Sequence, residues 1–276
     1  MSDFYFPLEE WTNSFVNEWL LPTMGDFFDQ VSDILGLFVD GVTDGLIFIP
    51  TIILTLIVAG LSLWLSGKGL AVFTIIGAIY LVSVDLWPEA MQTMAIVIVA
   101  TLLSIIIGVP IGILSSKNET IYKIVRPVLD FMQTLPSFVY LIPAILLFGL
   151  GGVPAVMSTF IFATPPAVRM TNLGIRQVPE DMVEASRAFG STPWQLLFKV
   201  ELPMALQTIM AGINQTIMLA LSMAVIASMI GAPGLGSVVL SGISNVNVGL
   251  GLTGGLGIVV LAIIVDRLTQ GIGEKL

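Results

Sequence analysis

The stretch AMQTMAIVIVATLLSIIIGVPIGIL, residues 90–114, contains no charged side chain. A bilayer core about 30 Å thick is crossed by roughly 20 residues of helix, because each residue advances the helix by about 1.5 Å. This stretch is therefore long enough to cross a membrane as one helix. It predicts an all-α protein that is embedded in a bilayer.

Further apolar stretches lie on both sides of this one along the chain. Hydrophobic residues make up 56% of the sequence and charged residues only 11%, whereas soluble domains carry about 25% charged residues. With so few charges, much of the surface must face lipid. We expect about seven transmembrane helices, and the other six lie at residues 46–65, 70–87, 128–150, 153–168, 206–230 and 249–268.

The positive charges predict the orientation. All ten Lys and Arg residues lie at Lys68, within 117–126, within 169–199, or at Arg267 and Lys275. With seven spans and an outside N-terminus, these positions all fall on the same side of the membrane. Because Lys and Arg accumulate on the cytoplasmic side, the sequence predicts that the N-terminus lies outside and the C-terminus in the cytoplasm.

Missing residue types exclude several kinds of chemistry. The chain has no Cys and no His, which excludes Cys/His zinc sites, Cys nucleophiles and Ser-His-Asp triads. The Gly67-Lys68 pair lacks the upstream glycine of a phosphate-binding P-loop. We therefore expect no catalytic residue, no metal and no cofactor in this chain, and no nucleic-acid partner.

The N-terminal residues 1–45 form an acidic tail with helical periodicity. Membrane-surface helices usually carry Lys or Arg on the polar face, but this tail carries acids there. We expect interfacial helices on the outer side that pack partly on protein; a loosely ordered tail with one helix is the alternative. The apolar positions are Phe27, Phe28, Val31, Ile34, Leu35 and Phe38, with Asp26, Asp29, Asp33 and Asp40 between them, after an earlier set of Leu8, Trp11, Phe15, Trp19 and Leu20.

Residues 169–203 form a long polar stretch that predicts a short helix, a turn and a second short helix. Pro179 before two acids favours a helix start, and Gly190 favours a stop. Pro193 favours the start of the second helix. The first helix has an apolar, small-residue face, which suits either a protein partner or an amphipathic loop lying on the membrane. That face consists of Met182, Ala185, Ala188 and Phe189.

The same stretch resembles the EAA signature of ABC-importer permeases, E-A-A-x3-G-x9-I-x-L-P. The departures from that pattern are Ser186 for alanine and Val200 for isoleucine. The resemblance implies a type I permease core of five spans over about 90–276, with 169–203 as the cytoplasmic segment that couples to an ATPase. The matching residues are Glu184, Ala185, Ser186, Gly190, Val200, Leu202 and Pro203.

Residues 129–144 and 214–236, together with the acidic tail, resemble glycine betaine/proline betaine permeases. The resemblance implies two accessory spans at 46–89 before the core, and a bacterial cytoplasmic membrane as the location. It also implies three partners: a substrate-binding protein outside, an ATPase subunit that binds ATP and Mg, and a second copy of this chain. Choline, carnitine and proline are alternative solutes.

Six residues within the predicted spans are candidates for lining a translocation path. Prolines interrupt helical hydrogen bonding, amides add polar groups, and aromatic rings attract quaternary ammonium groups. The alternative is that the polar residues bridge helices and the aromatic residues only pack. The candidates are Pro136, Phe138, Tyr140, Pro143, Asn214 and Gln215.

Three other features have structural interpretations. Gly108 and Gly112 favour close helix packing, and Asp130 lies four residues after Arg126, which favours an ion pair within one helix. An ion-coupled secondary transporter is a rival class, but no charge lies near the centre of a predicted span. A membrane scaffold, the other rival, has no need of the helix-turn-helix segment.

Overall fold

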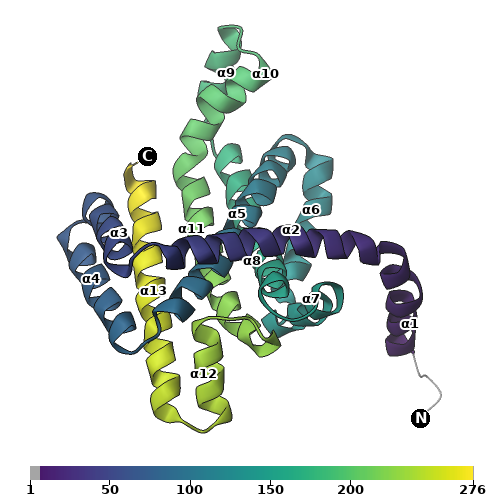
Figure 1. The fold of residues 1–276 in the computed structure, drawn as a ribbon. Helices are drawn as coiled ribbons and strands as arrows, with labels where there is room; N and C mark the ends of the chain where they lie inside the picture. Colours follow the sequence, from purple (N-terminus) through teal and green to yellow (C-terminus); the bar gives the residue numbers. More distant parts are fainter. Residues whose placement is uncertain (1–6, 276) are drawn as a thin grey trace, which may run out of the picture.

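The computed structural model describes residues 7–275, and every regular element in that range is a helix. Most of the long helices run side by side in a bundle, while one long helix crosses the bundle and one hairpin projects from its end (Figure 1). The predicted all-α class is confirmed for the described residues.

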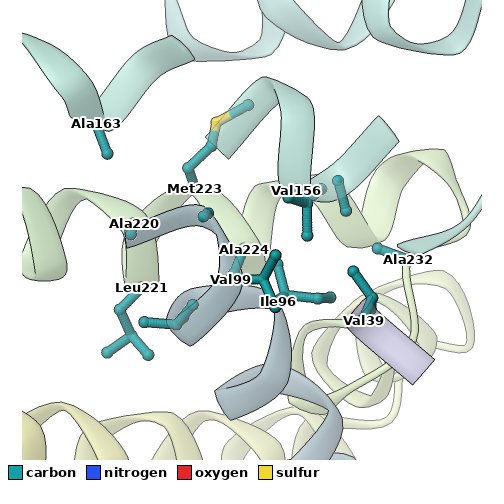
Figure 2. Packing of buried hydrophobic residues seen from close by; sticks show 14 of the residues in the cluster. Val39, Ile96, Val99, Val156, Ala163, Ala220, Leu221, Met223, Ala224 and Ala232 are labelled. Carbon is teal, nitrogen blue, oxygen red and sulfur yellow. The ribbon is translucent and has the colours of Figure 1, made fainter. Parts of the chain in front are cut away.

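Three helices form the centre of the bundle: α5 (Trp87–Lys117), α8 (Gly152–Arg176) and α11 (Leu202–Ile226). Their apolar faces meet in the main core of the protein, to which α2 contributes the buried Val39 (Figure 2). Labelled residues of this core are Ile96 and Val99 of α5, Val156 and Ala163 of α8, Ala220, Leu221, Met223 and Ala224 of α11, and Val39 of α2.

Small residues let α5 and α8 approach each other closely. A Cβ atom on Gly112 would lie 2.6 Å from the Cβ of Thr171, and one on Gly108 would lie 3.1 Å from the Cβ of Ala167. Membrane helices associate largely through such close packing, because lipid tails are as apolar as the side chains they would replace. The predicted packing role of the two glycines is confirmed.

Two shorter helices flank the centre beside α13 (Val248–Lys275): α3 (Thr51–Ser66) and α4 (Lys68–Ser83). Ser62 and Thr74 join α3 to α4 through their hydroxyls, 3.1 Å apart. Two more hydroxyl groups tie this pair to α13, because Ser66 donates to the carbonyl of Arg267 and Tyr80 donates to that of Thr253.

The tail is helical from Leu8 onward, as α1 (Leu8–Ser14), η1 (Phe15–Leu20) and α2 (Leu21–Phe48). α2 crosses the bundle (Figure 1) and buries Leu35 and Val39 against it. The expected helices that pack partly on protein are confirmed for this segment, which is more regular than a loose tail with one helix.

A sharp bend separates the tail from the first span. The tail helix and α3 meet at 98° around Pro50, so the apolar run predicted at 46–65 enters its own helix only at Thr51. Pro50 lacks a backbone N–H and has an extended conformation at ψ 132°. The change of direction therefore falls at this proline.

The stretch 128–150, predicted as one span with prolines that interrupt its hydrogen bonding, is not one continuous helix. α6 (Glu119–Thr134) stops before Pro136, a 3-10 turn η2 (Ser137–Tyr140) follows, and α7 (Leu141–Phe148) leaves at 108° to α6. Proline removes a donor from the helical ladder and disfavours the helical conformation at the residue before it. Leu135 accordingly has an extended ψ of 136°.

The stretch 231–248, which connects the predicted spans at 206–230 and 249–268, is not an irregular loop. It contains α12 (Leu235–Ser244), which pairs with the first turns of α13 in a helical hairpin. Glycines permit the close pairing, since a Cβ atom on Gly242 would lie 2.5 Å from the backbone nitrogen of Gly251. The short apolar run has no charge to mark it, and its helical partner is not evident from sequence spacing.

Among the described residues, three helical stretches are long and apolar enough to cross a membrane: Trp87–Lys117, Pro193–Ile230 and Val248–Lys275. Two bent pairs pass the same test when each pair is taken together. The chain thus has an all-helical membrane fold with three to five clear candidates for spans.

Candidate functional site

The segment that projects from the bundle is built by local signals. α9 (Glu180–Ala188) begins directly after Pro179, with acidic side chains in its first turn that complement the helix dipole. It ends at Ala188, and the turn that follows contains Gly190, whose φ of +80° favours glycine. The backbone N–H of Ser191 donates to the carbonyl of Ser186 at 3.2 Å and closes the turn. The predicted start and stop are confirmed.

The second half of the segment starts with α10 (Pro193–Leu196) and continues as η3 (Leu197–Glu201) into α11. A reciprocal capping box fixes its start: the Gln195 N–H donates to the Thr192 hydroxyl, and the Thr192 N–H donates to the Gln195 side chain. The predicted second helix at Pro193 is confirmed. We call residues 180–201 the projecting hairpin.

The projecting hairpin exposes large apolar side chains. Phe189 is 92% exposed, and the rings of Trp194 and Phe198 stack with their centroids 5.6 Å apart on an exposed surface. Glu184 and Ala185 of α9 are exposed as well. Because the hairpin extends away from the bundle (Figure 1), this surface favours contact with a partner over a loop that lies flat on the membrane.

The seven signature residues fall into two groups. Glu184, Ala185, Ser186 and Gly190 lie on α9 and its closing turn, where the hydroxyls of Ser186 and Ser191 are 2.7 Å apart. The other three lie at the base of the hairpin, where it joins the bundle: Val200 and Leu202 are half-buried and Pro203 is exposed.

The base also contains a partly buried ion pair that sequence reasoning missed. The carboxylate of Glu201 accepts from the ammonium of Lys117, the last residue of α5, and Glu201 is only 4% exposed. One signal was available: Glu201 follows Leu197 by four residues and so shares its apolar helix face. An acid on such a face requires a counter-charge.

The same end of the bundle is joined by a polar network between α5, α6 and α8. Arg176 donates to the carbonyl of Ser115 at 3.1 Å and to the carboxylate of Glu119 at 3.0 Å, and its guanidinium lies 4.4 Å from the ring centre of Tyr122. The amide of Asn172 donates to the hydroxyl of Ser115 at 2.9 Å. These contacts bind the end of α8 to the end of α5.

Asp130 does not pair with Arg126, and that prediction is wrong. Its carboxylate instead accepts from Arg169 of α8 at 2.6 Å. An i,i+4 pair with the cation on the N-terminal side is the weaker orientation on a helix, and α8 lies beside α6 with a better placed guanidinium. Arg126 lines a hollow of about 430 Å³ between these two helices.

Four of the six path candidates lie at the break between α6 and α7. Pro136 makes the break, Pro143 lies within α7, and Phe138 is 58% exposed. Tyr140 is buried, donates its hydroxyl to the carbonyl of Met132, and packs edge-on against the ring of Phe162. Tyr140 therefore stabilises the break, while Phe138 offers a free ring face.

The two amide candidates of α11 differ from each other. Asn214 bridges to α13, donating to the carboxylate of Asp266 at 3.1 Å and accepting from the hydroxyl of Thr269 at 2.6 Å. This is the interhelical bridging that was the alternative for Asn214. Gln215, the next residue, is exposed.

No group of three or more His, Cys, Asp or Glu side chains with the geometry of a metal site occurs between residues 7 and 275. What the site offers is a polar, ion-paired bundle end from which an apolar hairpin projects. Such an arrangement is suited to binding a partner protein rather than to chemistry on a substrate.

The sequence of the C-terminal part of the chain matches a known family. Residues 104–276 match the family described as binding-protein-dependent transport system inner membrane component. This region begins within α5 and includes the projecting hairpin, α11 and α13.

Curated relatives match over nearly the whole chain. The glycine betaine transport system permease protein OpuAB of Bacillus subtilis is 52% identical, and the match covers 98% of this chain and 95% of the relative. The glycine betaine/proline betaine permease ProW of Escherichia coli is 47% identical over 97% of this chain and 75% of its own. The glycine betaine/carnitine permease GbuB of Listeria monocytogenes is 46% identical over 98% of this chain and 96% of its own.

Solved structures agree on the fold. A chain of the MetNI methionine ABC transporter in an inward facing conformation superposes with a TM-score of 0.58 at 25% identity, covering 66% of this chain and 90% of that one. A chain of an amino acid ABC transporter crystallised with histidines gives 0.57 at 18% identity. The protein therefore belongs to the inner membrane components of binding-protein-dependent transport systems, the non-catalytic permeases of ABC transporters.

Proposed function

We propose that this chain is the permease subunit of an ATP-driven importer for glycine betaine or a closely related quaternary amine. Coupling to ATP is supported by the projecting hairpin. Its exposed surface includes Glu184, Ala185 and Gly190, and it also exposes aromatic rings. The solute is inferred from the full-length relatives named for glycine betaine transport.

We propose a seven-span topology with the N-terminus outside. Two accessory spans at 46–89 precede a core at 90–276, and residues 1–45 form an acidic tail on the outer face. Contacts support the sidedness: basic residues from separate parts of the sequence gather near the base of the hairpin, as in the Lys117–Glu201 and Arg176–Glu119 pairs. In the cytoplasm these cations obey the positive-inside rule.

We propose an assembly of two copies of this chain with two ATPase subunits inside and a substrate-binding protein outside. ATP and Mg belong to the ATPase subunits, because this chain lacks the phosphate-binding loop. The ATPases would dock on the two hairpins, and their closure would alternate access through a rigid-body change. Of the six path candidates, Phe138 and Gln215 have exposed side chains, and we propose them as the first to test for contact with solute.

The test is uptake into proteoliposomes that hold the complete complex. We expect uptake of labelled glycine betaine to require internal ATP and to be unaffected by ionophores. Uptake that proceeds without ATP and is abolished by ionophores would indicate a secondary transporter. Competition by proline betaine, choline, carnitine and proline ranks the solutes. A binding assay on the isolated substrate-binding protein with the same compounds identifies the solute independently.

A variant tests the hairpin assignment. Gly190→Trp places a large side chain at a left-handed position in the turn, so we expect loss of ATPase association and of uptake. The control is Gly69→Ala in α4, where a Cβ atom meets nothing within 4 Å. Full association and uptake by Gly190→Trp would refute docking at this turn.

A further inference from the structure

The tip of the projecting hairpin has few contacts with the rest of the protein. α9 has no buried residue and packs mainly on α10 and η3, the two other elements of the hairpin. Figure 1 shows α9 and α10 standing clear of the bundle. A displacement applied at the tip therefore reaches the bundle through η3 and the helix that continues from it.

Two side chains of η3 face inward at the base. Leu197 joins a small core with Ile175 of α8 and Ile209 of α11, against which Ile113 of α5 also packs. Glu201 lies four residues later and is the one charged residue that is buried among residues 7–275. The base of the hairpin thus rests on α5 and α8, with a carboxylate inside the contact.

Lys117 holds that carboxylate from the side of α5. Its ammonium is bonded to Glu201 while 42% of its side-chain surface remains exposed. As a cation in the last turn of α5, Lys117 is also favoured by the helix dipole. A carboxylate removed from water is costly to leave without its partner. Separation of the hairpin from α5 is therefore opposed by a charge as well as by apolar contact.

α5 transmits any such displacement to α8. The two helices are in close contact at Gly112 and Thr171, and Ser115 is bonded by both Asn172 and Arg176 of α8. A force that moves the end of α5 thus moves the centre of the bundle. The ion pair connects the exposed hairpin to this rigid pair of helices.

We propose that the Lys117–Glu201 ion pair is the joint that makes the projecting hairpin and α5 move as one body during transport. Both are positioning residues: they contact neither solute nor nucleotide, and they keep the hairpin aligned with the spans. This inference rests on the proposed function, since it requires that an ATPase act on the hairpin.

Charge variants test the joint in the reconstituted complex. In Glu201→Gln and Lys117→Met we expect ATP hydrolysis to continue while glycine betaine uptake per ATP falls about tenfold. A factor of this size is typical of the coupling between distant sites. The exchange Lys117→Glu with Glu201→Lys restores opposite charges, so it should recover most of the uptake per ATP. The control is Lys123→Met on α6, an exposed lysine with no salt bridge in the described structure, which should behave like wild type.

A covalent joint provides a second test that does not depend on the charges. The chain has no Cys, so Lys117→Cys with Glu201→Cys creates the only two thiols in the permease. A short bis-methanethiosulfonate linker between them should raise uptake per ATP toward the wild-type value, and reductant should reverse the gain. If the joint has to open during transport, the linked protein will instead stop.

The outcomes separate this inference from the proposed function. If wild type shows no ATP-driven uptake of any of the tested amines, the proposed function fails. If wild type transports but the single charge variants keep its ratio of uptake to ATP hydrolysis, the proposed role of the ion pair as a joint is wrong. If the single variants fail to assemble, the linked cysteine pair tests the proposal instead. Linkage that restores uptake supports the joint. Linkage that abolishes uptake or does not improve it overturns the proposal.

Discussion

Gly112 and Gly60 are both glycines within helices, but their surroundings are opposite. A Cβ atom on Gly112 would lie 2.6 Å from Thr171 and 2.8 Å from the carbonyl oxygen of Val168, whereas one on Gly60 meets nothing within 4 Å. Alanine gains about 1 kcal/mol of helix propensity over glycine, while overpacking costs about 1–3 kcal/mol. Gly112→Ala should therefore lower thermal stability in detergent and Gly60→Ala should raise it. Stability changes of the same sign would refute the tight α5–α8 contact.

A substitution at Phe189 can distinguish an effect on partner binding from an effect on the stability of the permease. Because it is 92% exposed, Phe189→Ser should leave the melting temperature of the purified permease unchanged. If the hairpin is the docking surface, the same variant should lose most of the ATPase subunit on co-purification. Phe38→Ser on α2, at another exposed phenylalanine, is the control and should keep the ATPase. Equal retention of the ATPase by both variants would place docking elsewhere.

Short-range residue patterns were predictable from sequence, and pairs across helices were not. Pro179 and Gly190 mark the ends of α9 because capping depends on the residues nearest in the chain. Asp130 was assigned to Arg126 by spacing alone, but Arg169 of a neighbouring helix binds it. The Lys117–Glu201 pair has a separation of 84 residues, and its partners meet only because the bundle brings α5 beside the base of the hairpin.

α2 is held to the bundle by a few side chains on one face, and this attachment is testable. Val39 is 5% exposed and faces Ile96 and Val156 in the core (Figure 2), whereas Leu37 is 76% exposed. Removing buried methyl groups costs roughly 1–3 kcal/mol through lost transfer energy and the cavity left behind. Val39→Ala should thus lower the melting temperature clearly, and Leu37→Ala should not. If both variants melt like wild type, α2 does not contribute to the stability of the core.

Elements were predictable where apolar length or periodicity is unambiguous. The long helices α5, α11 and α13 agree with the predicted spans, and the tail is helical as its periodicity indicated. Pro136 predicts an interruption of helical hydrogen bonding in 128–150 but not its form, because a proline in a membrane helix is compatible with a kink, a break or no change. Which one occurs depends on neighbours: Tyr140 bonds to Met132 across the break and packs on Phe162.

The orientation of the whole molecule rests on its ten cations, since Lys and Arg are restricted to a few segments and acids contribute little to the positive-inside bias. If these segments lie inside, a membrane-impermeant maleimide applied to intact cells should label Asp33→Cys on α2 and Asn245→Cys between α12 and α13. Lys123→Cys on α6 should react only after permeabilisation. All three positions are exposed, and the absence of native Cys makes each thiol unique.

The reverse labelling pattern would invert the proposed topology. Labelling of Asn245→Cys and Lys123→Cys from the same side would instead change the number of spans between them. Protection of Lys123→Cys in intact cells puts the projecting hairpin in the compartment that contains ATP, because α6 is paired through Glu119 with Arg176 at the base of the hairpin.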